Sequence, residues 1–334
     1  MIINLIWDAD GTLFNTYPTI TEALRLALVE FGAEVPTERI SHLVNVSFSH
    51  AVGTLAQELD LETEALNCRF YEILALLPPE AQGPFPGAVS LCNYVRSLGG
   101  QNYIVTHRGR ASLERLLEVH GIAHLFADLI TSDDAFPRKP DPAAFLALLE
   151  RQALDPAVTL AIGDRELDIL AARAAGLRTS FYGTNPHEVT ADVEVRDYAL
   201  LLGWLVRENA PQGVEAEGIF WRSLDVLIGS SPLVVDRPAG STHPRYPDFI
   251  YPLDYGYLAG TSSADGGGID VWVGSESPAG VTGIIVTVDL VKRDSEIKIL
   301  LGCTDGEMET VLRFHDTGPM AAVLLERPLS SGEA

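Results

Sequence analysis

Short apolar runs alternate with stretches of helical periodicity in the N-terminal part of the chain. The apolar runs occupy residues 2–7, 101–105, 128–131, 158–162 and 177–182. Between them, apolar residues recur at the spacing of amphipathic helices. The clearest helical stretches cover residues 87–98, 109–120, 141–152 and 165–175. Strands that alternate with helices favour a parallel sheet covered on both faces, so the pattern predicts an α/β fold with a Rossmann-like, doubly wound parallel sheet.

Two interruptions of this alternation indicate the domain organisation. Residues 18–80 have almost wholly helical periodicity, which predicts about four helices inserted after the first strand. The run ENAPQGVEAEG at 208–218 lacks apolar periodicity and is rich in Pro, Gly and Glu, so it predicts an interdomain linker. The first domain is therefore expected at 1–207. Residues 219–334 contain strand-like runs and little helical periodicity, which predicts a small β-rich domain.

The composition is typical of a soluble globular protein. The chain has 334 residues, of which 47% are hydrophobic and 21% charged, and this length suits about two domains. No uncharged apolar run reaches the ~18–20 residues of a membrane span, and the first residues lack the basic segment and cleavage site of a signal peptide. Three cysteines far apart give neither a disulfide framework nor a metal knuckle. These features predict a cytoplasmic protein with no membrane partner.

The charge of the chain narrows the class of partner. The formal net charge is −23 at pH 7. Such a surface repels a phosphate backbone, so we expect no binding of nucleic acid. A small phosphorylated substrate would need a few local cations or metal ions to hold it.

The first apolar run is followed directly by DADGT at residues 8–12. Asp8 and Asp10 therefore lie at the carboxyl end of the first predicted strand, which is the edge where open α/β sheets bind ligands. Two carboxylates separated by one residue project toward the same side of an extended segment. Gly11 permits a sharp turn, and Thr12 offers a hydroxyl there.

Three further motifs follow DADGT at the ends of other predicted strands. They are IVTHRG at 104–109, RKPDP at 138–142 and IGDRELD at 162–168. In this order the four motifs resemble those of the haloacid dehalogenase-like hydrolase superfamily, and in particular its phosphoglycolate-phosphatase-like branch. The resemblance covers residues 1–205. It implies that the helices at 18–80 form a cap that closes over the site, excludes water and reads the substrate.

The resemblance implies a catalytic role for one residue of each motif. Asp8 matches the nucleophile that forms an aspartyl-phosphate, and Asp10 matches the general acid and base. Thr106 would hydrogen-bond the phosphoryl oxygens, and Lys139 would supply the positive charge that the nucleophile and substrate need. The residues expected beside the substrate are Thr12, His107 and Arg108.

The resemblance also implies a magnesium site. Asp164 follows the strand predicted at 158–162, and Asp168 is four residues further on, so both share one face if a helix begins there. Mg²⁺ is a hard cation that prefers oxygen ligands, and it would offset the repulsion between these carboxylates and a phosphate. The expected ligands are Asp8, Asp10, Asp164 and Asp168.

Branches of the superfamily differ in their chemistry, and two of them fit this sequence poorly. A dehalogenase does not need the second acid, whereas Asp10 is present here. A phosphonatase uses a lysine of the inserted helices, and residues 15–80 contain no lysine. We therefore expect Mg²⁺-dependent hydrolysis of small phosphomonoesters, with a phosphomutase as the less favoured alternative. The motifs do not name the ester.

The second domain contains YPLDYGY at 251–257. Residues 220–315 resemble soluble inorganic pyrophosphatases, which implies a small β-barrel with a carboxylate-lined mouth. In such enzymes several Mg²⁺ ions generate the attacking hydroxide, and no covalent intermediate forms. A second site in this domain would comprise Asp265, Asp270, Tyr255, Lys298 and Arg245.

The match to this second family is incomplete. Asp265 and Asp270 occupy two of the three aspartate positions in the family's acidic motif, but Gly267 occupies the third. Loss of one carboxylate should weaken the binding of both metal and pyrophosphate. Two hypotheses therefore stay open for this domain. It is an inorganic pyrophosphatase, or it is a non-catalytic module that binds a ligand, regulates the phosphatase or joins two chains in a homodimer.

Overall fold

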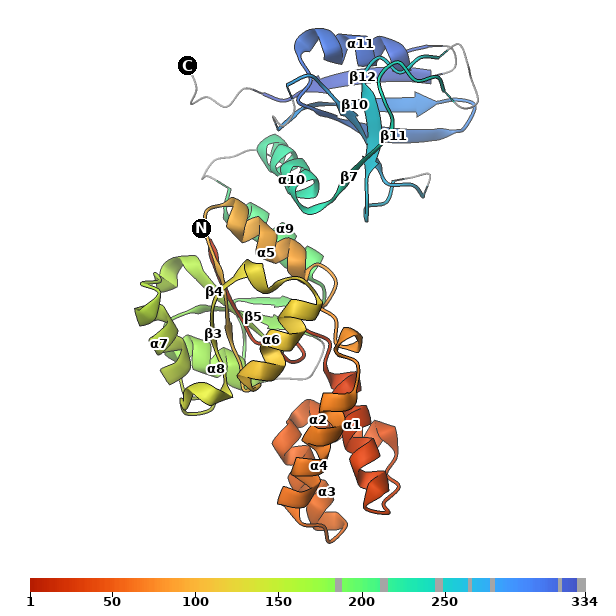
Figure 1. Cartoon of the computed structure of the whole chain (residues 1–334). Helices are drawn as coiled ribbons and strands as arrows, with labels where there is room; N and C mark the ends of the chain where they lie inside the picture. The colour runs from red at the N-terminus through yellow and green to blue at the C-terminus, as the bar shows by residue number, and fades with distance from the viewer. Residues whose placement is uncertain are drawn as a thin grey trace. The chain divides into compact units, whose positions relative to one another are not determined.

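The computed structural model describes residues 1–183, 188–210, 216–243, 249–263, 266–276, 280–317 and 320–328. The chain divides into two compact units, Met1–Asn209 and Ala210–Ala334, which Figure 1 shows together. Each unit has its own sheet and its own hydrophobic core. Among the described residues, no helix is both long and apolar enough to cross a membrane.

Unit 1 is built on a six-stranded sheet of strand order β3-β2-β1-β4-β5-β6. Every pair of neighbouring strands is parallel, which confirms the predicted parallel sheet. The strands are β1 (Asn4–Trp7), β2 (Asn102–Val105), β3 (Phe126–Ile130), β4 (Thr159–Gly163), β5 (Arg178–Tyr182) and β6 (Val193–Val195). The strand order reverses between β1 and β4, so a crevice forms where their carboxyl ends diverge.

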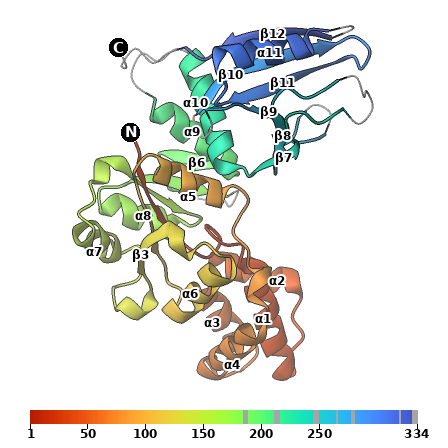
Figure 2. The same ribbon diagram turned by 45° about the horizontal axis from the view of Figure 1, so that its top comes forward.

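Helices cover both faces of this sheet, as the two views in Figures 1 and 2 show. They are α5 (Ala88–Ser97), α6 (Arg110–Val119), α7 (Ala143–Arg151), α8 (Glu166–Ala174) and α9 (Tyr198–Glu208), with short 3-10 turns at Pro79–Ala81, Ala123–Leu125, Ser132–Asp134 and Pro156–Val158. On one face, Phe145 of α7 and Ala171 of α8 pack against Ile6. On the other face, the ring of Trp7 meets that of Tyr198 from α9 at 5.3 Å between centroids.

Four helices lie between β1 and the rest of the sheet in sequence. They are α1 (Tyr17–Glu30), α2 (Thr37–Val46), α3 (Phe48–Glu58) and α4 (Thr63–Leu76). Their apolar faces pack on one another around Leu24, Leu28, Leu55 and Phe70. This bundle therefore has a core separate from that of the sheet, as the cap implied by the sequence resemblance would need.

Unit 2 contains a second six-stranded sheet, of order β12-β10-β11-β9-β8-β7. The strands are β7 (Leu233–Arg237), β8 (Asp254–Leu258), β9 (Ile269–Val273), β10 (Val281–Asp289), β11 (Asp294–Leu301) and β12 (Met320–Glu326). Neighbours are antiparallel except for β9 and β11, which run parallel. In the described part of unit 2, two helices accompany the sheet, α10 (Ala216–Ser230) and α11 (Asp305–His315). Helix α10 begins inside the range 208–218 that the sequence suggested as a linker.

The barrel predicted for this unit is not what the structure contains. Among the described residues, β7 and β12 form the two edges of the sheet, and no pairing joins them. Alternation along each strand sends Ile284 to the face covered by Trp221 of α10 and Ile285 to the face covered by Met308 of α11. Because a helix covers each face, the sheet is the middle layer of an open sandwich.

Candidate active site

The loop after β1 places Asp8 at the centre of the crevice. Asp8 is only 2% exposed, and its backbone N–H bonds the carbonyl oxygen of Ile162 on β4 at 2.9 Å. Gly11 turns the chain with a φ of +80°, and a Cβ atom there would lie 2.5 Å from a carboxylate oxygen of Asp164. Both the backbone angle and the close approach require glycine at this position.

Lys139 joins two of the carboxylates. Its Nζ lies 2.6 Å from Oδ1 of Asp8 and 2.6 Å from Oδ1 of Asp168, and all three side chains are almost fully buried. Asp168 lies in the first turn of α8, directly after β4. Gly163 ends β4, and a Cβ atom there would lie 2.3 Å from the Cβ of Asp168. The glycine therefore lets the first turn of α8 approach the end of the strand.

Asp164 is fixed by two hydroxyl donors. Thr12 donates to Oδ1 at 3.0 Å, and Tyr17 donates to Oδ2 at 2.6 Å. Thr12 belongs to the loop after β1, whereas Tyr17 is the first residue of α1. One of these bonds thus reaches Asp164 from the inserted helices.

Asp8, Asp164 and Asp168 form the one cluster among the described residues with the spacing of a metal site. One ligand oxygen from each lies within 4.8 Å of the others, and all three residues are buried. Oδ2 of Asp8 is buried without a hydrogen-bond partner in the described part of the chain. A buried carboxylate oxygen left without a partner is costly, and a hard cation would satisfy it. These residues therefore fit Mg²⁺.

Burial and charge act in opposite directions within this cluster. Burial raises the pKa of Asp8 to about 7, against the opposing charge of Lys139, and raises the pKa of Asp164 to about 6. Burial acts in the same way on Asp168, but the charges of Lys139 and Arg165 outweigh it and the pKa lies below its usual value. A cation bound among these groups would favour the ionised form of each.

The motif at the end of β2 lines a second side of the crevice. Thr106 is 4% exposed, and His107 accepts the backbone N–H of Lys139 on Nε2 at 2.9 Å. Burial, followed by the charges of Lys139 and Arg138, lowers the pKa of His107 to about 3, so the ring is neutral. A cavity of about 170 Å³ beside these residues is also lined by Phe136 and Arg138.

Asp10 is not among the three residues with metal-site spacing in the described part of the chain. Its Oδ1 is 2.6 Å from Nη1 of Arg108, a residue whose side chain is only 7% exposed. The resemblance implied Asp10 as a fourth Mg²⁺ ligand, and that assignment stays a prediction. The structure pairs Asp10 with one of the residues expected beside the substrate.

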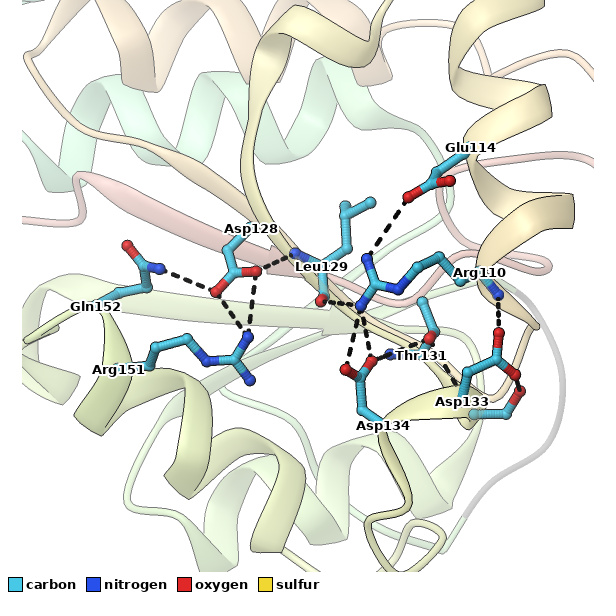
Figure 3. A network of polar contacts seen from close by, with 10 residues as sticks. Arg110, Glu114, Asp128, Leu129, Thr131, Asp133, Asp134, Arg151 and Gln152 are labelled. Atoms are coloured by element: carbon cyan, nitrogen blue, oxygen red, sulfur yellow. Dashed lines mark hydrogen bonds and ion pairs between the residues drawn. The ribbon is translucent and has the colours of Figure 1, made fainter.

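A polar network joins the segment that follows β3 to the start of α6 (Figure 3). Arg110, at the start of α6, donates to Asp134 at 2.9 Å and to the carbonyl oxygen of Leu129 at 3.1 Å. Asp134 also accepts the backbone N–H of Thr131 at 2.7 Å, and Asp133 accepts that of Arg110 at 2.8 Å. This network attaches the carboxyl end of β3 to the start of α6.

Sequence reasoning missed three residues of this crevice. Tyr17 bonds Asp164, and Gln82, which is 3% exposed, accepts from Nη2 of Arg108 at 3.1 Å. Arg165 lies with Nε 3.8 Å from Oδ2 of Asp168. Arg165 lies inside the motif IGDRELD, between Asp164 and Asp168, so the motif could have pointed to it as a residue of the site. Tyr17 and Gln82 lie at the two ends of the helical insert, where no spacing rule points to the site.

The residues suggested for a second site are only partly described. Lys298 is 4% exposed and lies 2.5 Å from Asp270 and 2.8 Å from Glu296. Tyr255 is also buried, with its ring centroid 6.0 Å from the Lys298 ammonium. Asp265 and Arg245 lie outside the described residues.

Known proteins resemble the N-terminal part of the chain. The family model of haloacid dehalogenase-like hydrolases matches residues 5–181. The phosphoglycolate phosphatase of Rhodospirillum rubrum is 29% identical over 216 residues, which cover 60% of this chain and 90% of the relative. That of Cereibacter sphaeroides is 31% identical over 185 residues, which cover 53% of this chain and 84% of the relative.

A solved structure supports the same fold. The crystal structure of CbbY from Rhodobacter sphaeroides in complex with phosphate matches with a TM-score of 0.52 and 19% identity, and covers 60% of this chain and 96% of that chain. The matched family model lies within unit 1 and takes in the buried aspartates and lysine of the crevice. The chain therefore belongs to the haloacid dehalogenase-like hydrolase family.

Proposed function

We propose that this protein is a Mg²⁺-dependent phosphatase of small phosphomonoesters, similar to the phosphoglycolate phosphatases, and that it acts through an aspartyl-phosphate on Asp8. One observation carries the proposal. Asp8 is buried at the carboxyl end of β1, bonded to Lys139 through one oxygen and without a described partner on the other. This is the environment of a nucleophile that is held in place by a cation and is open to a phosphoryl group.

The chain's own groups account for the covalent steps. An oxygen of Asp8 attacks phosphorus, the bond from phosphorus to the ester oxygen breaks, and Asp10 gives its proton to the departing oxygen. Water then attacks the phosphorus of the aspartyl-phosphate, Asp10 takes a proton from that water, and inorganic phosphate leaves with Asp8 restored. The hydroxyl of Thr106 lies at the end of the neighbouring strand, where it would hydrogen-bond the phosphoryl oxygens.

Lys139 has two tasks in this scheme. It holds Asp8 and Asp168 at 2.6 Å each, and it places a positive charge where negative charge gathers in the transition state. Asp8, Asp164 and Asp168 would hold Mg²⁺, which when bound neutralises the phosphate and polarises it toward attack. The neutral ring of His107 orients the backbone of Lys139 by accepting its N–H.

For unit 2 we favour a binding or regulatory module over a pyrophosphatase. Pyrophosphate hydrolysis requires carboxylates that are free to hold several metal ions. In unit 2, Asp270 and Glu296 flank Lys298, and the described residues there form no group of three carboxylates with the spacing of a metal site.

Phosphate release tests both proposals in the full-length protein. We would measure it with Mg²⁺ on a panel of phosphomonoesters and on pyrophosphate, for the wild type, Asp8→Asn and Asp270→Asn. We expect Asp8→Asn to abolish ester turnover and Asp270→Asn to leave it unchanged. Ester turnover that survives in Asp8→Asn would overturn the mechanism. Pyrophosphate turnover that survives in Asp8→Asn but is lost in Asp270→Asn would make unit 2 an enzyme.

A further inference from the structure

Arg108 is a buried cation outside the metal cluster, and it bonds three separate segments of unit 1. Its Nε donates to the hydroxyl of Ser112 on α6 at 3.0 Å, and its Nη2 donates to the side-chain carbonyl of Gln82 at 3.1 Å. Its Nη1 lies 2.6 Å from Oδ1 of Asp10. The planar guanidinium therefore has one bond on each nitrogen, which fixes its orientation.

Asp10 has no comparable set of partners. Among the described residues, Arg108 is the one side chain that bonds its carboxylate, and 23% of the Asp10 side chain is exposed. The carboxylate of an aspartate turns freely about two bonds when nothing holds it. Proton transfer to a leaving oxygen depends on the placement of the acid within hydrogen-bond reach, so the group that holds Asp10 matters for the reaction.

Gln82 is a neutral group and adds no charge to this arrangement. It is buried, and it belongs to the segment between α4 and α5 through which the chain returns from the inserted helices to the sheet. Its contribution is an acceptor that sets the angle of the guanidinium. A chain of two side-chain hydrogen bonds thus links this returning segment to Asp10 by way of Arg108.

We propose that Arg108 is a positioning residue that sets the Asp10 carboxylate for proton transfer, and that Gln82 in turn orients Arg108. The inference rests on the proposed phosphatase function, in which Asp10 protonates the leaving oxygen. Arg108 then acts through Asp10 rather than by binding the phosphoryl group. It follows that the need for Arg108 depends on how much the leaving group needs a proton.

The test compares two substrates in the full-length protein. An alkyl phosphate has a poor leaving group that must be protonated, whereas para-nitrophenyl phosphate has a good one that needs little help. The value of kcat/KM reports the steps up to leaving-group release. For Arg108→Gln we expect kcat/KM to fall about 100-fold on the alkyl phosphate and far less on the nitrophenyl ester. Asp10→Asn should show the same selectivity.

A double-mutant cycle separates the two roles of an arginine at this place. If Arg108 acts through Asp10, Arg108→Gln causes no further loss in an Asp10→Asn background. Equal losses on both substrates, or a full additional loss in that background, would mean that Arg108 binds the phosphoryl group directly and would overturn the proposal. The matched control is Arg110→Gln, two residues away, whose partner is Asp134; any loss there should not depend on the leaving group.

A milder variant covers the case in which Arg108→Gln does not fold. Gln82→Met keeps Arg108 and the side-chain volume but removes the acceptor of Nη2. We expect a smaller loss that is still selective for the alkyl phosphate, and a loss of equal size on both substrates would contradict the orienting role. Failure of the phosphatase proposal itself looks different, because ester turnover would then persist in Asp8→Asn.

Discussion

The hydroxyl of Tyr17 bonds a carboxylate that we assign to the magnesium site. It donates to Oδ2 of Asp164 at 2.6 Å while Thr12 holds the other oxygen. Partners of this kind orient a metal ligand, and their loss commonly lowers metal affinity by about 10–100-fold. We expect Tyr17→Phe to raise the Kd for Mg²⁺ within this range, measured by titration calorimetry and by the Mg²⁺ dependence of phosphate release.

The control for this prediction is Tyr103→Phe, which removes the hydroxyl of another buried tyrosine, on β2. The same two measurements should leave its Mg²⁺ affinity at the wild-type value. An unchanged Kd in Tyr17→Phe would show that Thr12 alone orients Asp164, and the assignment of Tyr17 would then be wrong.

Because His315 is buried, the free energy of unfolding of unit 2 should fall at low pH. Its Nε2 accepts the indole N–H of Trp272 at 3.1 Å, and burial, together with the charge of Lys298, lowers the pKa of the ring from 6.5 to about 3. The unfolded chain therefore binds a proton before the folded one does as the pH falls. The neutral His315 ring therefore contributes fully to the free energy of unfolding above pH 6.5. This contribution is lost progressively as the pH falls toward 3.

Each pH unit in this window should cost up to about 1.4 kcal/mol of unfolding free energy. The measurement is urea unfolding of unit 2, followed by tryptophan fluorescence, at a series of pH values for the wild type and His315→Gln. Because carboxylates titrate in both proteins, the informative quantity is the difference between them. Parallel pH profiles for the two proteins would contradict the assignment.

At the scale of elements, Asp134 joins the end of β3 to the start of α6 (Figure 3). Its Oδ2 accepts from the backbone and hydroxyl of Thr131 and from Arg110. Hydrogen bonds that involve a charged group are worth about 1.5–3 kcal/mol each, less at partly exposed sites. We expect Asp134→Ala to lower the free energy of unfolding of unit 1 by about 1–3 kcal/mol, measured by chemical denaturation. A loss below the error of that measurement would make the network incidental.

The elements of unit 1 were largely readable from the sequence because each strand is a short buried run. Burial on both faces makes β1 and β4 continuous apolar segments, and the motifs stand directly after them. Asp8 and Asp164 could therefore be placed at one edge of the sheet. Tyr17 and Gln82 could not, because their bonds to the site depend on how the inserted helices return to the sheet.

In unit 2 the sequence was misread at one helix. Trp221, Leu224 and Ile228 have the spacing of a helix face and pack on the sheet. The run of Pro, Gly and Glu at 208–218 was interpreted as a linker, and this hid the start of α10. The barrel was implied by the resemblance to soluble inorganic pyrophosphatases, whereas α10 and α11 cover the two faces of an open sheet.

At the scale of the whole molecule, every residue assigned to catalysis lies in unit 1, and unit 2 has a core of its own. Leu300 is fully buried in that second core. Leu300→Ala should cost unit 2 about 2–5 kcal/mol of unfolding free energy, because the substitution leaves a cavity. We expect kcat and KM for ester hydrolysis to stay at their wild-type values in this variant. If kcat or KM of the variant departs from the wild-type value over the temperature range in which its unit 2 unfolds, unit 2 regulates the phosphatase. The two units of this chain would then work as one enzyme.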